Sequence, residues 1–490
     1  MGGVWVRRIR RTAGIWILCL LLAACSTVTP LPPSVIPERP APTQPIRRGP
    51  FAFTLAYSRA DGLDPFKTVT RVNRDLAGLI YEGLWEYDRN GVPGPRLAKD
   101  LTAAEGRLTV TLREDALFSD GTPVTAAEVI ASFDAARESE AYGPRLRRFG
   151  AAAQGEKGTV VFTLTAGEPF PTAALTFPIV KPGEEGMTGT GPYRYDPASG
   201  LIANPLWGSV NFPEIRLLDL VEEEERLKGL ELGHISYMFT DLSGGQPPRV
   251  TGAFTAVPME YLMFLGVNAE GKALGPATRQ ALDKALNRER LTAAAFGGYA
   301  VPALTLFPEG FAAANGFSLL FSPQADREGA LALLADLEGP LTLTLAVNEE
   351  NEQKCALARQ VAEQLGAVGI TVNVTPLPFQ DYLYALRHGR YDLYIGEIRL
   401  PANMDLDPLL KKGGAAFYGP SEKDGAVIAW AAFCKGETDA AGLEAAFAAS
   451  LPYIPLCWRC GLAAYDRALT NVTPTGYDPY AGLDKWNIIE

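Results

Sequence analysis

The order strand, helix, strand within residues 341–376 constrains the fold more than any other feature of the sequence. Residues 341–348 (LTLTLAVN) and residues 370–376 (ITVNVTP) alternate larger apolar side chains with smaller or polar ones, which is typical of strands. Residues 353–369 (QKCALARQVAEQLGAVG) lie between them and have a helical pattern. Because two strands joined through a helix lie parallel in one sheet, this segment predicts an α/β lobe with a partly parallel sheet.

The length of the chain requires more than this one lobe. A single hydrophobic core stops growing at roughly 250 to 300 residues, and this sequence has 490. Its content of 47% hydrophobic and 21% charged residues is that of an ordinary folded protein. Residues 453–466 (YIPLCWRCGLAAYD) are apolar and strand-like, and they follow the segments of both lobes. We therefore predict two or more domains, with this late strand crossing back to the first of them.

Residues 1–24 are predicted to be a targeting segment. Four arginines precede an apolar stretch over residues 13–22, which is too short to span a bilayer because a span needs roughly 20 apolar residues. The letters LAAC that follow end at Cys25 and resemble the lipobox of bacterial lipoproteins, in which cleavage leaves cysteine first and a lipid on its sulfur. We therefore expect lipidation of Cys25, with an uncleaved membrane anchor as the alternative.

Residues 25–49 are predicted to be a proline-rich linker behind the lipid anchor. Eight prolines occur from Ser26 through Pro50, the last of them Pro50 itself, and almost nothing apolar recurs at regular spacing. Such a segment is extended, at ~3.1 Å per residue where it is polyproline-like. We interpret it as a spacer between membrane and folded domains, with a Pro-rich ligand for a partner module as the alternative.

The sequence lacks the common signatures of catalysis and of cofactor binding. Its two histidines are far apart, so we expect no histidine-based metal site and no cofactor. Neither GxSxG nor HExxH occurs, and residues 189–196 (GTGPYRYD) lack the context of a dinucleotide-binding loop. Cys457 and Cys460 form a CxxC pair, but in a strand pattern, where residues three apart face opposite ways beyond disulfide reach. We interpret both as structural cysteines and expect no catalytic residue.

Several segments of the sequence share their order and spacing with a known protein family. They are LDPF (63–66), YEGLWEYDRNGVPGPRLAKDL (81–101), LREDALFSDGTPVTAAEVIASF (112–133), GTGPY (189–193) and TRQALDKALNRERL (278–291). Taken together, they resemble the family 5 extracellular solute-binding proteins, which are the oligopeptide- and dipeptide-type receptors of ABC importers. The resemblance covers residues 51–490.

This resemblance implies an α/β fold of the periplasmic-binding-protein type. It has two lobes, belongs to the type II large cluster with an extra subdomain in lobe I, and closes on its ligand about a hinge of two strands. The strand patterns at Glu260 to Asn268 and Tyr453 to Leu462 stand where this hinge is expected. The implied parts are a signal peptide (1–24), the linker (25–49), the core of lobe I (50–66, 188–267 and 456–490), the extra subdomain (67–187) and lobe II (268–455).

The resemblance also implies carboxylates for a ligand ammonium. Receptors of the family often pair the α-ammonium of a peptide with an aspartate near Gly-Trp-x-x-Asp and Asp-Pro elements, because a buried ammonium requires a counter-charge. The matching segment here is YIGEIRLPANMDLDPLL (394–410), in which Asp405 is the first candidate and Glu397 the second. Asp407 fits the Asp-Pro element, and capping a turn is its alternative role. Glu397 stands where tryptophan is usual, so the segment departs from the family pattern.

On the opposite lobe, the loop after the first strand is expected to face the cleft by resemblance. It contains Ser58 and Arg59. Arg59 has the planar guanidinium that binds a ligand carboxylate with two hydrogen bonds, and a surface arginine is the alternative.

The function implied by the resemblance is that of a lipid-anchored extracytoplasmic receptor. It would capture peptides at the outer face of the cell membrane or in the periplasm and deliver them to an ABC permease and its ATPase. A monomer without enzymatic activity is expected, and the formal net charge of −11 argues against nucleic acid as a partner. The alternatives are a non-peptide solute (sugar, antibiotic, opine or metal chelate) and, more remotely, a thiol oxidoreductase that uses the CxxC pair.

Overall fold

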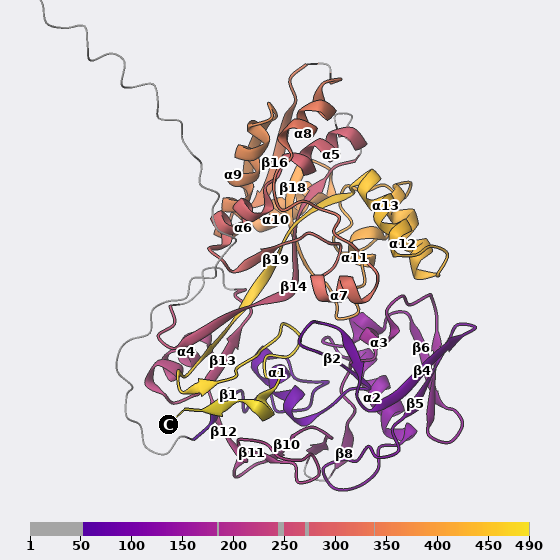
Figure 1. Ribbon diagram of the computed structural model, residues 1–490, viewed down its shortest axis with the longest axis vertical. Coiled ribbons are helices and arrows are strands. Elements are labelled where there is room, and N and C mark those ends of the chain that lie inside the picture. The colour runs from indigo at the N-terminus through magenta and orange to yellow at the C-terminus, as the bar shows by residue number, and fades with distance from the viewer. Residues whose placement is uncertain (1–51, 184–185, 244–248, 270–273, 338, 490) are drawn as a thin grey trace, which may run out of the picture. The chain divides into compact units, whose positions relative to one another are not determined.

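The computed structural model of the chain (Figure 1) describes residues 52–183, 186–243, 249–269, 274–337 and 339–489. The predicted signal peptide, Cys25 and the proline-rich linker lie outside these ranges and stay predictions. Within the described ranges, no helix has the length and apolar character that crossing a bilayer requires.

One mixed sheet of 11 strands carries both halves of the fold. In spatial order its strands are β10 (Tyr193–Asp196), β11 (Gly200–Ala203), β12 (Glu214–Asp219), β1 (Thr54–Tyr57), β13 (Tyr237–Thr240), β19 (Tyr453–Tyr465), β14 (Ala253–Val267), β18 (Leu393–Arg399), β16 (Thr342–Asn348) and β17 (Thr371–Leu377), with β15 (Ala300–Pro302) paired to β19. The pairs β1–β12, β1–β13, β16–β17 and β16–β18 are parallel, and the other pairs are antiparallel.

The predicted strand, helix, strand segment is confirmed. β16 and β17 are parallel neighbours, and α9 (Glu352–Gly366) connects them. Asn351 caps α9, because its side chain accepts a hydrogen bond from the backbone N–H of Lys354. The apolar residues of β16 pack with the buried face of α9, including Leu357 and Val361, and so form the core of this half of the sheet.

Two long strands form the centre of the sheet. β14 has 15 residues and β19 has 13, and the two pair antiparallel along most of their length. β19 also pairs with β13 on one side, while β14 pairs with β18 on the other, as Figure 1 shows. The strands predicted at 260–268 and 453–462 are therefore confirmed. They connect the two halves of the sheet, whereas the predicted domain boundaries stay a prediction.

The CxxC pair lies on β19, and both thiols are free and buried. Cys457 is 0% exposed and Cys460 is 2% exposed. Burial raises the pKa of Cys460 to about 12, so its reactive thiolate is scarce at neutral pH. This placement confirms the interpretation of both residues as buried structural cysteines on a strand.

A second sheet lies within the region predicted as the extra subdomain. Its strands, in spatial order, are β4 (Ala98–Ala104), β5 (Arg107–Leu112), β7 (Thr159–Leu164) and β6 (Phe149–Gln154). The helix α2 (Ala126–Glu138) begins at a capping box of Thr125 and Glu128. Its buried face carries Val129, Ser132 and Phe133, which are the residues predicted to share a face.

The remaining elements of the described ranges are helices and three small sheets of two strands each. The other helices are α1 (Arg71–Ile80), η1 (Gly143–Leu146), α3 (Pro171–Ala174), α4 (Glu223–Leu232), α5 (Pro276–Ala285), α6 (Arg288–Phe296), α7 (Glu309–Ala314), α8 (Arg327–Leu334), α10 (Phe379–Arg387), α11 (Asp407–Leu410), α12 (Gly425–Cys434), α13 (Ala440–Ser450) and η2 (Leu483–Lys485). The other strands are β2 (Trp85–Tyr87) with β3 (Pro93–Pro95), β8 (Lys181–Gly183) with β9 (Gly186–Thr188), and β20 (Leu469–Thr470) with β21 (Asn487–Ile488).

Candidate functional site

A cavity of about 720 Å³ lies where several distant segments meet. Its walls come from α1, from residues 140–147 around η1, from the end of β18 with the following loop, and from residues 476–479. Glu260 of β14 also contributes to the wall. The volume falls in the range of roughly 300–1,000 Å³ that is typical of sites for small molecules.

The walls of this cavity are charged and aromatic. The arginines are Arg71, Arg74, Arg145, Arg147 and Arg399. The carboxylates are Asp75, Glu86, Glu140, Glu260 and Asp478. The tyrosines are Tyr81, Tyr87, Tyr142 and Tyr477. Charges of both signs in similar number make the cavity suitable for a ligand that carries both.

Some of these charges already have partners within the protein. The Nε atom of Arg71 lies 2.7 Å from an Asp75 oxygen, and the Nε atom of Arg399 lies 3.9 Å from an oxygen of Glu260. Three buried polar atoms of the walls have no hydrogen-bond partner among the described residues: Nη1 of Arg71, Oε1 of Glu260 and the hydroxyl of Tyr477. Such atoms are rare in folded proteins and require an explanation.

Two of the tyrosines form a stacked pair at the cavity. The rings of Tyr87 and Tyr477 lie 4.0 Å apart between centroids and are inclined by 15°. The hydroxyl of Tyr87 donates a hydrogen bond to the carbonyl of Ala402, in the loop that follows β18. The pair therefore joins β2 to the C-terminal segment and to this loop, and it presents aromatic surface to a ligand.

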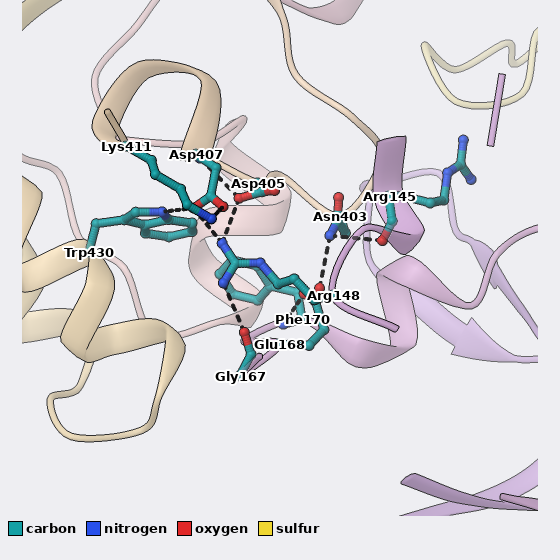
Figure 2. A network of polar contacts seen from close by, with 10 residues as sticks. All are labelled: Arg145, Arg148, Gly167, Glu168, Phe170, Asn403, Asp405, Asp407, Lys411 and Trp430. Atoms are coloured by element: carbon teal, nitrogen blue, oxygen red, sulfur yellow. Dashed lines mark hydrogen bonds and ion pairs between the residues drawn. The ribbon is translucent and has the colours of Figure 1, made fainter. Parts of the chain in front are cut away.

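Asp405 and Asp407 are placed together, but beside the cavity, and both are bound to one arginine. The Nη2 atom of Arg148 lies 2.9 Å from Oδ1 of Asp405 and 2.6 Å from Oδ1 of Asp407 (Figure 2). Asp407 also accepts hydrogen bonds from the indole of Trp430 at 2.8 Å and from Lys411 at 3.1 Å. Neither aspartate lines the cavity. In this structure both carboxylates neutralise Arg148, which comes from the predicted extra subdomain.

Apolar contacts accompany this ion cluster. Phe170 packs against the rings of Phe311 and Phe307, with centroids 4.9 and 5.6 Å away. A Cβ atom on Gly167 would lie only 1.9 Å from the carbonyl oxygen of Cys434, so only glycine permits this approach of the two backbones. Arg148 donates to the Gly167 carbonyl at 2.9 Å, which holds the loop in place. The segment 148–170 is thereby docked on residues of the predicted lobe II.

Glu397 is likewise bound to cations of the protein. One carboxylate oxygen lies 2.6 Å from Nη1 of Arg459, and the other lies 2.7 Å from Nζ of Lys354. Glu397 is not part of the cavity wall. Its charge is therefore compensated by Arg459 of β19 and Lys354 of α9.

Ser58 and Arg59 also lie away from the cavity. Ser58 is buried, and its backbone N–H and C=O both bind the side-chain amide of Asn73 at 2.7 Å. Arg59 is exposed, and its Nε donates to the hydroxyl of Tyr57 at 3.0 Å. The structure thus brings none of the five predicted ligand residues into the cavity, and their role in binding stays a prediction.

Sequence reasoning missed most residues of the cavity wall. Glu260 was noticed only as the first residue of a predicted strand, and the segments 140–147 and 476–479 carry no motif. Isolated arginines and carboxylates are usually solvated surface residues. Two signals were available: a charged residue within a largely apolar strand, at Glu260, and the family segment 81–101, which contains Tyr81, Glu86 and Tyr87 of the wall.

A sheet shared by two halves, with a charged cavity beside its long central strands, defines a two-lobed solute-binding protein. Residues 92–412 match the profile "Bacterial extracellular solute-binding proteins, family 5 Middle". This match covers more than half of the chain, so the chain belongs to the family 5 extracellular solute-binding proteins, as the resemblance implied.

Named relatives and solved structures agree with this assignment. The glutathione-binding protein GsiB of Escherichia coli (strain K12) is 26% identical over 358 residues, which are 64% of this chain and 67% of GsiB. The unliganded open form of MppA, a periplasmic murein tripeptide binding protein, covers 90% of this chain and 98% of its own, with a TM-score of 0.71 and 18% identity. A nickel ABC transporter structure from Bacillus halodurans covers 89% and 99%, with a TM-score of 0.72 and 19% identity. These structures confirm the predicted two-lobed α/β fold.

Proposed function

We propose that this chain is the receptor of an ABC importer and that it captures a short peptide in the charged cavity. The mixed-charge wall with its buried, unpartnered polar atoms carries the proposal, because a peptide offers amide donors, amide acceptors and both charges. The names of two similar proteins state that they bind glutathione and a murein tripeptide, and both of these ligands are short peptides. The receptor delivers its ligand to a permease and its ATPase and performs no covalent chemistry.

Free peptides are expected to stabilise the ligand-stripped protein. A ligand that binds only the native state raises the unfolding free energy by about 2.7 kcal/mol at 100 times its Kd. The measurement is the melting temperature with pools of di- to hexapeptides, beside pools of sugars, opines and nickel chelates. Mass spectrometry of the molecule that copurifies with the protein identifies the natural ligand class.

Comparing the melting temperatures measured with peptides and with the other solutes distinguishes a peptide ligand from the alternatives. A melting temperature that no peptide pool changes, together with a shift by another solute, contradicts the peptide part of the proposal. A nickel chelate or a sugar is then the ligand of the same cavity.

The lipid anchor is tested by replacing Cys25 with alanine in a bacterial host. The C25A variant is expected to lose labelling by an alkyne fatty acid and to leave the membrane fraction, because lipid on this sulfur provides the attachment. The matched control is C19A, which changes the other cysteine of the N-terminal region and should keep both label and location. Retention of C25A in the membrane would instead support an uncleaved anchor.

A further inference from the structure

We propose that the cavity holds a zwitterion, with its cationic group on Glu260 and its carboxylate on Arg145. This inference rests on the proposed function, because it takes the cavity as the solute site. It differs from what the resemblance implies, where Asp405 is the first partner of a ligand ammonium.

Glu260 is a buried carboxylate with little compensation. Its residue is 4% exposed, it lies in the cavity wall, and Oε1 has no hydrogen-bond partner among the described residues. The other oxygen lies 3.9 Å from Nε of Arg399, whose side chain is 48% exposed. Burial raises the pKa of Glu260, despite the opposing charges of Arg399, Arg71 and Arg145. A ligand ammonium or guanidinium would give the free oxygen a charge-assisted hydrogen bond.

Arg145 is the complementary cation, and it is half-buried in the cavity wall. Its Nη1 donates to the hydroxyl of Thr176 at 2.8 Å, and its guanidinium lies 5.0 Å from the centre of the Tyr142 ring. No carboxylate lies within ion-pair distance of it among the described residues. Burial lowers the pKa of Arg145. Its remaining N–H groups match the two oxygens of a ligand carboxylate.

The charged residues beside the cavity that the resemblance pointed to are already paired within the protein. Arg148 stands three residues after Arg145 and is bound to Asp405 and Asp407. Figure 2 shows the Arg145 side chain pointing away from this cluster, with only its backbone carbonyl accepting a hydrogen bond from Asn403. Asp405 therefore lacks a free charge for a ligand. Glu260, in contrast, has one oxygen without a hydrogen-bond partner, and Arg145 has no ion-pair partner among the described residues.

The test uses the full chain and a random tripeptide library in three forms: free, N-acetylated and C-amidated. The parent should bind the free library, and each blocking group should weaken binding about tenfold or more, because it removes one charge-assisted contact. In E260Q, binding of the free library should fall by a similar factor, and N-acetylation should no longer matter. R145Q should show the same pattern for C-amidation, and R145K should recover part of the affinity.

Matched controls come from the exposed surface. E422Q and R327Q make the same chemical changes at exposed positions, and both should bind all three libraries as the parent does. E260Q keeps the shape of the side chain and removes a buried charge, so its unliganded melting temperature should not fall below that of the parent. This measurement separates lost binding from lost folding.

The two proposals fail in different ways. If the parent binds the free library but the variants keep its sensitivity to both blocking groups, the zwitterion assignment is wrong and the peptide receptor stands. If the parent binds no peptide, the proposed function is wrong, and the copurified molecule decides the assignment. If the copurified molecule is a zwitterion that binds both E260Q and R145Q about tenfold more weakly than the parent, the zwitterion assignment is upheld. If that molecule lacks one of the two charges, the zwitterion assignment is wrong.

Discussion

The R148M variant is expected to lose about 3–5 kcal/mol of the free energy that holds segment 148–170 on the predicted lobe II. Removing this guanidinium leaves Asp405 and Asp407 without their shared cation, although their side chains are only 4% and 19% exposed. Opening of this contact hydrates both carboxylates and relieves the penalty. Hydrogen exchange should therefore rise about a hundredfold or more in residues 143–171 and 400–411.

An exposed ion pair provides the control for this variant. Arg113 lies 2.8 Å from Asp115, but the two side chains are 43% and 74% exposed. Water already solvates both charges, so R113M should change stability by less than about 1 kcal/mol. Exchange in R148M within twofold of the parent would contradict the buried cluster. Asp405 would be left without an ion-pair partner among the described residues, and Asp407 would keep only Lys411 and the Trp430 indole.

The F170A variant is expected to lose about 3–5 kcal/mol of unfolding free energy. Phe170 is 4% exposed and packs edge-on against the rings of Phe307 and Phe311, so truncation leaves a cavity in an aromatic cluster. The measurement is denaturant unfolding with exchange data for both sides of the contact. If the docked form is the one that binds ligand, the apparent affinity should fall in proportion to the fraction of molecules that remain docked.

Two further variants separate the packing of Phe170 from general effects of phenylalanine removal. F170L retains most of the apolar volume and should cost less than about 1.5 kcal/mol. F379A removes a ring that is 42% exposed and should stay within about 0.5 kcal/mol of the parent. An F170A protein as stable as F379A would show that the aromatic cluster does not hold Phe170 in solution.

Docking and ligand recognition use adjacent but separate charges. Arg148 holds the predicted extra subdomain on Asp405 and Asp407, while Arg145, in the same short segment, lines the cavity. A change at Arg148 should therefore lower the binding affinity for peptides of every charge by the same factor. A change at Arg145 should instead reduce the preference for peptides with a free carboxylate over amidated ones. This difference lets binding experiments distinguish the two arginines.

Local sequence patterns predicted the elements of the fold well, because they depend on near neighbours. Alternating side chains identified β16 and β17, and the Thr125 and Glu128 capping box located the start of α2. The long apolar run beginning at Glu260 identified part of β14. The family motifs added the two-lobed architecture, which no local pattern contains.

The sequence by itself determined several strands and helices, the α/β class and the family of this protein. Only the tertiary structure decided which charges are available to a ligand. Arg148 and Asp405 lie 257 positions apart in the chain, so nothing near either residue indicates that they neutralise each other. The resemblance selected Asp405 for its motif, and the fold instead leaves Glu260 with a buried, unpartnered oxygen in the cavity wall. The physical reason is that a charge is compensated by whatever lies within a few ångströms, and folding alone determines those neighbours.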